Sequence, residues 1–156
     1  MGLSQEFYAG DAGCIGRAFS DIEWDNLRDE TATAAYADLS LHLSPDDLDT
    51  LSEVAAGLAG ATPHLLSECL IRQVGAIDDG EMGGAYVVDP KWPRMIASLE
   101  EEVAETLTAR WFRRLDQTSG ESLEVNQGAV AAIRGLIRLC KKSVAACHEV
   151  VYVWYL

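Results

Sequence analysis

Basic residues are scarce in this sequence, and they are scarcest in its first ninety positions. The chain has 12 lysines and arginines against 25 aspartates and glutamates, a formal net charge of −13. Residues 1–90 carry 17 of the acids and three of the bases, whereas residues 91–156 carry eight acids and nine bases. An excess of carboxylates repels nucleic acid and anionic membranes and attracts cationic molecules over a Debye length. We therefore expect no nucleic-acid or membrane partner, and we expect any protein partner to be basic.

The sequence also lacks the segments that direct a chain into or across a membrane. No run reaches the roughly 18 apolar residues that a spanning helix needs. Residues 1–11 have neither the basic region nor the apolar stretch of a secretion signal. We therefore expect a cytoplasmic protein, in which the four irregularly spaced cysteines are reduced, structural thiols: Cys14, Cys69, Cys140 and Cys147.

Signatures of catalysis and of metal binding are missing as well. The histidines, His42, His64 and His148, form no His-x-His or His-x-x-x-His pair, and no Cys-x-x-Cys occurs. There is no phosphate-binding loop and no Gly-x-Ser-x-Gly motif. The sequence therefore predicts no catalytic residue, no cofactor and no metal site, and it favours a protein that is not an enzyme.

Two short motifs leave alternatives open. Cys147 and His148 are a thiol and an imidazole side by side, but neighbours in a strand point to opposite faces. Cys140 and Cys147 have the spacing of two core residues on one helix face, so we interpret both thiols as structural. The segment 78–81 (Asp-Asp-Gly-Glu) departs from the EF-hand pattern; a solvated loop is the first interpretation, and weak calcium binding is the alternative.

Alternating and β-branched segments predict the strands. Short strands are indicated at residues 5–8 and 85–88. Over residues 36–43, Leu39, Leu41 and Leu43 occupy every second position, which predicts a strand with one buried face. The run 150–156 is apolar on both faces, as is typical of a strand that is covered on both sides.

Capping residues and apolar periodicity predict the helices. Ser44 and Pro45 begin one helix, which ends near Gly60, and Thr62 and Pro63 begin the next. The predicted helices cover residues 45–59, 62–74, 93–116 and 123–146, with a short fifth helix between 21 and 30, and residues 75–84 are predicted to be a loop. No element is predicted around the three glycines Gly10, Gly13 and Gly16. These elements predict an α+β fold of one domain, residues 1–156. Four to five helices pack on a small mixed or antiparallel sheet that contains a buried C-terminal strand.

The bases of the last predicted helix form a stripe: Arg134, Arg138, Lys141 and Lys142. On so acidic a chain we expect this stripe to pair with the acidic first half of the protein or with a second copy. Glutamates 100–102 are interpreted as a solvated helix face.

The sequence supports two functions of different classes. The first is a small acidic protein that binds and neutralises a basic protein, as the immunity protein of a toxin does; its candidate contact residues are Asp25, Asp29, Asp46 and Asp49. The second is a small-molecule enzyme or ligand-binding domain whose site is assembled only by the fold. Histidine, cysteine and carboxylate groups gathered in one pocket would favour the second function, and a broad acidic face without a pocket would favour the first. Both leave a homo-oligomer open.

Overall fold

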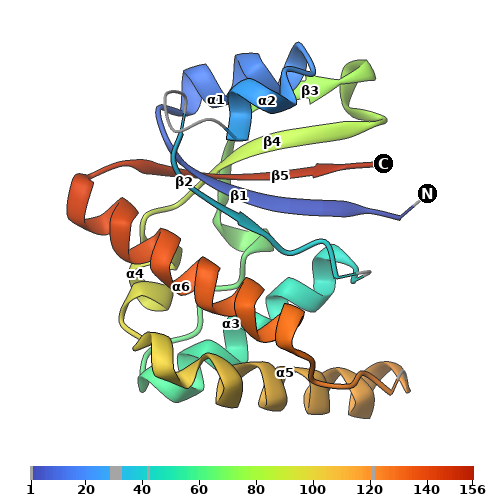
Figure 1. The fold of residues 1–156 in the computed structure, drawn as a ribbon, viewed down its shortest axis with the longest axis vertical. Coiled ribbons are helices and arrows are strands. Elements are labelled where there is room, and N and C mark those ends of the chain that lie inside the picture. Colours follow the sequence, from blue (N-terminus) through green and yellow to red (C-terminus); the bar gives the residue numbers. More distant parts are fainter. Residues whose placement is uncertain (1, 29–32, 42, 121) are drawn as a thin grey trace.

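In the computed structural model, the chain folds around one five-stranded antiparallel sheet (Figure 1). The structure describes residues 2–28, 33–41, 43–120 and 122–156. The strands stand in the order β2-β1-β5-β4-β3, and their bounds are β1 Ser4–Gly10, β2 Thr33–Asp38, β3 Leu70–Ile77, β4 Gly83–Val88 and β5 Glu149–Tyr155. Because helices pack on this antiparallel sheet, the predicted α+β class is confirmed.

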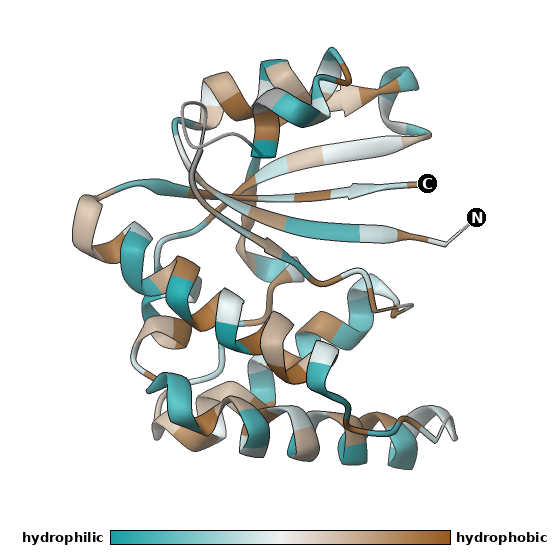
Figure 2. Cartoon of the chain, viewed as in Figure 1, coloured by the Kyte–Doolittle hydropathy of each residue, from teal (hydrophilic) through white to brown (hydrophobic). Residues whose placement is uncertain are grey.

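Helices cover both faces of the sheet (Figure 1). One face carries α1 and α2, and the thicker layer on the other face holds α3 to α6. Their bounds are α1 Ala12–Ser20, α2 Trp24–Arg28, α3 Pro45–Ala59, α4 Lys91–Ala97, α5 Ala104–Ser119 and α6 Gln127–Ala146, with short 3-10 turns η1 Ser67–Cys69, η2 Asp78–Gly80 and η3 Glu101–Val103. Apolar and polar residues alternate along α5 and α6, as expected of helices that bury one face (Figure 2). Among the described residues, no helix is long and apolar enough to cross a membrane.

The C-terminal strand lies in the middle of the sheet, as predicted. β5 pairs with β1 on one side and with β4 on the other. Val150 and Tyr152 belong to the core under α3 to α6, whereas Val151 and Val153 belong to the core under α1 and α2. Full burial of such an apolar side chain contributes roughly 1.5–3 kcal/mol, so β5 stabilises both cores at once.

A close contact between α1 and β3 accompanies one difference from the prediction, the helix expected over residues 62–74. The glycine-rich residues 12–20 form a helix, α1, whose cap Asp11 accepts a hydrogen bond from the Cys14 N–H (2.8 Å). Residues 62–74 do not form the predicted helix. The chain instead runs through a loop and η1 into strand β3. α1 crosses β3 so closely that a Cβ on Gly16 would lie 2.2 Å from the Val74 carbonyl oxygen. This tertiary packing overrides the local helix signals.

The irregular segment between β3 and β4 is also shorter than predicted. Gly75 lies in β3 and Gly83 and Gly84 lie in β4, so only residues 78–82 connect the two strands. A Cβ on Gly75 would lie 2.6 Å from the Gly16 carbonyl oxygen. Part of the glycine content of this segment therefore serves close packing rather than a flexible loop.

The strand predicted over residues 36–43 is wrong in its position, because β2 ends at Asp38. The Asp38 carboxylate accepts a hydrogen bond from the Ser40 N–H (2.8 Å), and the Leu41 N–H donates to the Leu39 carbonyl (2.8 Å). These local bonds turn the chain out of the sheet. Leu39 and Leu43 are buried as core residues outside the strand. The prediction for position 42 lies outside the described residues.

The helix predicted from residue 93 onward is two helices. α4 ends at Ala97, and Glu100 takes an extended conformation (φ −79°, ψ 148°) before η3 and α5 begin. Leu99 is buried inside the break, so the apolar spacing continues across it and imitates a single helix. α3 begins at the predicted cap Ser44, whose N–H donates a hydrogen bond to the Asp47 carboxylate (2.7 Å), and Gly60 ends it in the left-handed region (φ 64°). α6 begins later than predicted, at Gln127.

The basic stripe of α6 pairs within the second half of the chain. Arg138 lies 2.7 Å from Glu101, and Lys141 lies 3.8 Å from Glu100 and donates a hydrogen bond to the Ala97 carbonyl. Glu100 and Glu101 therefore pair with α6, so residues 100–102 are not one solvated helix face as predicted, although Glu102 is exposed. Contrary to the prediction, Arg138 and Lys141 do not pair with the acidic first half of the chain.

Candidate functional site

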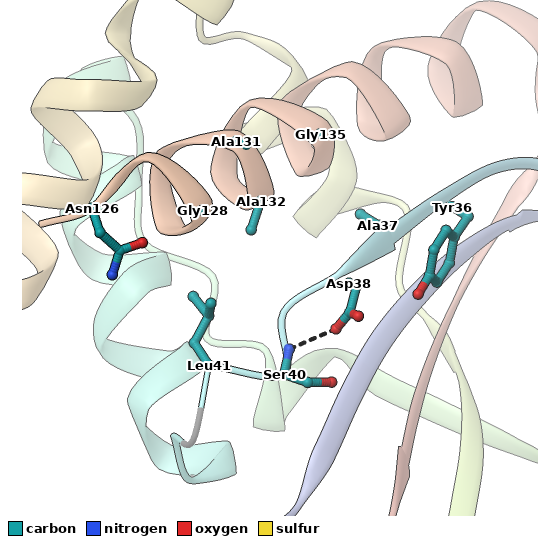
Figure 3. Close-up of a pocket in the computed structure, with 10 residues that line it drawn as sticks. All are labelled: Tyr36, Ala37, Asp38, Ser40, Leu41, Asn126, Gly128, Ala131, Ala132 and Gly135. Atoms are coloured by element: carbon teal, nitrogen blue, oxygen red, sulfur yellow. Dashed lines mark hydrogen bonds between the residues drawn. The ribbon is translucent and has the colours of Figure 1, made fainter.

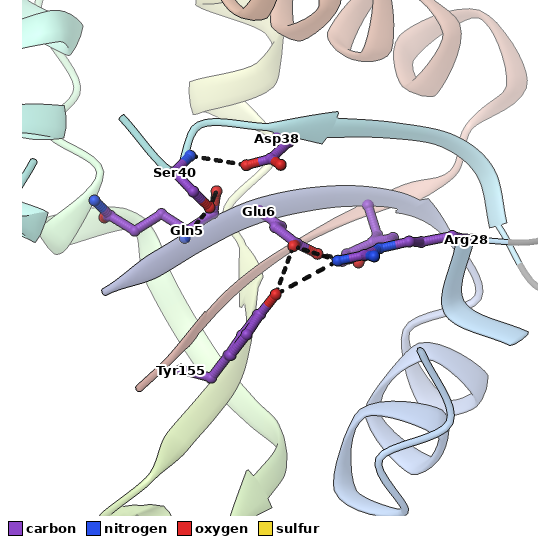
Figure 4. A network of polar contacts seen from close by, with 7 residues as sticks. Gln5, Glu6, Arg28, Asp38, Ser40 and Tyr155 are labelled. Carbon is purple, nitrogen blue, oxygen red and sulfur yellow. Dashed lines mark hydrogen bonds and ion pairs between the residues drawn. The ribbon is translucent and has the colours of Figure 1, made fainter. Parts of the chain in front are cut away.

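The charged group buried most deeply in the described chain is the carboxylate of Glu6 on β1, which is 1% exposed (Figure 4). Arg28, from the end of α2, lies 2.9 Å from it, and the Tyr155 hydroxyl donates a hydrogen bond of 2.8 Å. The Tyr8 hydroxyl donates a further, short hydrogen bond. The guanidinium also lies 5.7 Å from the ring centre of Tyr36, within cation–π distance.

The protonation of this network is set by burial. Burial and the hydrogen bond to Glu6 raise the pKa of Tyr8 well above its usual value, and the same two causes raise the pKa of Tyr155. Both phenols therefore stay protonated and act as donors. The Glu6 carboxylate accepts hydrogen bonds from Tyr8, Arg28 and Tyr155. No thiol, imidazole or second carboxylate of the described residues hydrogen-bonds to Glu6. The arrangement fixes α2 to the sheet rather than forming an acid–base pair.

Sequence reasoning missed this network. Its signal is a glutamate placed directly before two aromatic residues of an apolar strand, Phe7 and Tyr8. On the opposite face of β1, the buried Gln5 amide donates to the Leu43 carbonyl (2.9 Å) and accepts from the Tyr152 hydroxyl (2.8 Å). Throughout the described part of the chain, no buried side-chain polar atom lacks a hydrogen-bond partner. No such atom therefore indicates a bound ligand.

A cleft of about 420 Å³ runs between β2, at the edge of the sheet, and α6 (Figure 3). The α6 wall is made of small residues and the Asn126 amide: Asn126, Gly128, Ala131, Ala132 and Gly135. Among the described residues that line it, Asp38 alone is charged, and its carboxylate already accepts a hydrogen bond from the Ser40 N–H. The cleft therefore brings no set of reactive groups together.

A second cavity, of about 320 Å³, lies where α6 meets β5, against α4 and the ends of β3 and β4. Cys147, His148 and Glu149 line it together with Arg94 and Ser143, and the rest of its lining is isoleucine, valine and proline. Cys147 is exposed in the left-handed region (φ 54°), so its interpretation as a core residue spaced with Cys140 is wrong. Glu149 forms an ion pair with Arg72 at 3.2 Å.

The remaining thiols and His64, which the structure describes, form no cluster with one another. Cys69 and Cys140 are buried, burial raises the pKa of both, and Cys14 is exposed on α1. All four thiols are free. His64 lies in the loop before η1 and not in a helix. Within the described ranges, no group of three His, Cys, Asp or Glu residues is placed to hold a metal ion.

The structure does not bring the predicted partner-binding residues together. Asp25 is exposed on α2, whereas Asp46 is exposed on α3, on the other face of the sheet. Asp49 is half-buried, and its carboxylate accepts hydrogen bonds from the Ser67 N–H (2.9 Å) and hydroxyl (2.6 Å), which hold the loop before β3. Asp29 lies outside the described residues.

Another set of acids does meet, and we call it the acidic end. The Ser20 hydroxyl at the end of α1 accepts a hydrogen bond from the Ala76 N–H near the end of β3 (3.1 Å). This contact brings the α1–α2 turn beside the β3–β4 turn. The exposed acids of these two turns and of the first turn of α2 are Asp21, Glu23, Asp25, Asp78, Asp79 and Glu81. Residues 18–27 and 73–90 contain no lysine or arginine. The potential at this end is therefore strongly negative.

An exposed isoleucine stands in the same turn. Ile22 is 53% exposed and has a φ of 58°, in the left-handed region where a β-branched residue is strained. Its N–H donates to the Phe19 carbonyl in the bond pattern that ends α1, a place usually taken by glycine.

No family model, curated protein or solved structure matches this chain.

Proposed function

We propose that this protein binds a basic protein through its acidic end and thereby neutralises it, as an immunity protein does. The observation that supports this most is the meeting of two acidic turns, far apart in sequence, at the contact of Ser20 with Ala76. Carboxylates gathered in one place steer a cationic partner and raise its association rate by roughly 10- to 1,000-fold at low salt.

The exposed side chain of Ile22 is a second observation that supports the acidic end as a binding surface. A left-handed conformation costs an L-amino acid roughly 1–2 kcal/mol. Ile22 adopts this conformation although its apolar side chain is exposed and not buried within the chain. Interfaces are commonly held by a few apolar anchors inside a polar rim. Ile22 beside the acids of the two turns fits the role of such an anchor.

The test removes charge without disturbing the backbone. Asp78→Asn, Asp79→Asn and Glu81→Gln remove three charges, and asparagine tolerates the positive φ of 51° and 52° at positions 78 and 79. The matched control is Glu102→Gln, Glu105→Gln and Asp116→Asn, which removes three exposed charges from η3 and α5. Association kinetics with the protein that co-purifies from the native cells are measured against ionic strength.

The expected result is that the acidic-end variant associates at least tenfold more slowly at low salt and loses most of its salt dependence, while the control changes little. If the partner is acidic, or if association slows equally in both variants, the acidic end is not the binding surface.

A second candidate function, binding of a small molecule, is favoured by the cavity at the α6–β5 junction. A thiol, an imidazole and a carboxylate line it: Cys147, His148 and Glu149. Cys14 is also exposed, but the Arg17 guanidinium donates a hydrogen bond to its sulfur (3.3 Å), so the control is Cys147 itself without the imidazole. If His148 activates Cys147, iodoacetamide should alkylate Cys147 more slowly in His148→Gln than in the unaltered protein. Equal rates of Cys147 alkylation in the two proteins would contradict an activated thiol.

A further inference from the structure

A hollow of about 330 Å³ lies between α3 and α5, away from the acidic end. The α5 wall consists of Arg110, Arg113, Arg114 and Gln117. This places three of the twelve bases of a chain of net charge −13 in one hollow. The α3 wall supplies a single carboxylate, Glu53.

The charges of this hollow are not balanced within the described residues. Arg114 pairs with Glu53 at 2.9 Å, whereas Arg110 and Arg113 form no ion pair or hydrogen bond there through their side chains. Cations at i, i+3 and i+4 are neighbours on a helix surface and repel one another. A local charge of about +2 is therefore left in a protein that is otherwise strongly acidic.

The helix dipole does not account for these arginines. Cations are stabilised by it only in the last turn of a helix. α5 continues to Ser119, and its last turn contains no basic residue. Stabilisation by the helix dipole therefore does not explain why three arginines lie at these positions.

The floor of the hollow is open and apolar. A Cβ added to Gly57 on α3 would have no atom within 4 Å. Val54 and Leu58, one turn apart on the same helix, are mostly buried beside it and pack with the main core. A ligand here would meet guanidinium groups on one side and aliphatic side chains on the other.

We propose that this hollow binds the phosphoryl group of a small phosphorylated molecule. Guanidinium groups bind phosphate oxygens through paired hydrogen bonds, and two unbalanced arginines match the two charges of a phosphate dianion. A monocarboxylate would balance only one of them. The Gln117 amide is a further donor, and an apolar body of the ligand would lie on Val54 and Leu58.

The test uses inorganic phosphate and pyrophosphate as probes and acetate as the monoanion control, all at the same ionic strength. A ligand that binds only the folded state raises the melting temperature in a saturable way. We expect a saturable rise with phosphate and a larger one with pyrophosphate, and no rise with acetate. A rise with acetate equal to that with phosphate would overturn the phosphoryl assignment.

Two variants and one control locate the site. Arg110→Gln with Arg113→Gln should reduce the response at least tenfold in apparent affinity. Arg134→Gln with Lys142→Gln removes the same charge from exposed positions on α6 and should leave the response intact. Gly57→Leu fills the hollow without changing charge, and it should abolish binding while the ligand-free melting temperature is kept or raised, because leucine favours the helix more than glycine. Equal losses in the α5 and α6 charge variants, or unchanged binding in Gly57→Leu, would overturn the proposal.

Discussion

Glu6 on β1 and Arg28 on α2 form an ion pair of 2.9 Å in which the carboxylate is 1% exposed and the arginine side chain is 45% exposed. Removing one member of such a pair leaves the other without its counter-charge. Because water reaches Arg28, we expect Arg28→Met to lower the free energy of unfolding by only about 1–3 kcal/mol. Urea unfolding of the double variant Glu6→Gln with Arg28→Met gives the comparison. The double variant should be more stable than Arg28→Met alone, because it no longer buries an unpaired carboxylate. A lower free energy of unfolding in the double variant would contradict the dependence of Glu6 on Arg28.

Alkaline pH should destabilise the protein through its buried phenols. Burial raises the pKa of Tyr8 and of Tyr152 above the value near 10 of an unfolded tyrosine. Below pH 10 both states hold these protons, so stability does not change. Above pH 10 the unfolded chain releases protons that the folded chain keeps, and stability falls by about 1.4 kcal/mol per pH unit for each such phenol.

The free energy of unfolding measured from pH 8 to 11 tests this. Tyrosinate absorbance should rise together with the loss of circular dichroism. Tyr152→Phe should show a shallower decline above pH 10, and a slope equal to that of the unaltered protein would contradict the assignment.

Ile22→Gly should stabilise the protein by about 1 kcal/mol, because glycine adopts the left-handed conformation without a steric cost. Ile71 is a matched control, since it is similarly exposed (56%) but lies in strand β3. Ile71→Gly should destabilise the protein, because glycine weakens a strand. Loss of stability in Ile22→Gly, measured by urea unfolding, would show that the Ile22 side chain is held by packing instead of being free to act as an anchor.

Gly16→Ala should destabilise the protein by roughly 1–3 kcal/mol. Its methyl group would lie 2.2 Å from a backbone oxygen of β3, and neither α1 nor β3 can move without breaking the sheet packing. Gly135→Ala on α6 is the control, because a Cβ there meets nothing within 4 Å. It should be neutral or stabilising by up to about 1 kcal/mol, from helix propensity alone. Equal melting temperatures for the two variants would be incompatible with the described contact.

Elements whose signals are local could be predicted from the sequence, and elements determined by distant contacts could not. The helix start at Ser44 and Pro45 and the apolar run of β5 are examples of such local signals. The segment Thr62–Pro63 carries a correct-looking helix start, yet β3 forms because it pairs with β4 and packs against Gly16. The same holds for the acidic end. Its two turns are each visible as acidic segments, but only the packing of α1 on β3 brings them together.

The hollow between α3 and α5 shows a related limit. In a helix that ends at residue 116, as the sequence predicts, Arg110, Arg113 and Arg114 lie in the last turns, where cations are stabilised by the helix dipole. Once the helix is seen to continue to Ser119, that explanation no longer holds. Where a helix ends thus decides how its charges are interpreted.

The position of β5 also determines how this chain must fold. In the sheet, the β1–β2 pair and the β3–β4 pair touch only through β5, and the hydrogen bond from Tyr155 to Glu6 joins residues 149 positions apart. Contacts of such sequence separation form slowly, since much chain must be ordered before they are made. Until β5 inserts, one edge of β1 and one edge of β4 have no neighbouring strand, and edges of this kind are sites of intermolecular pairing. Refolding yield should therefore depend on protein concentration, and substitutions that weaken β5 should lower that yield as well as the stability of the native state.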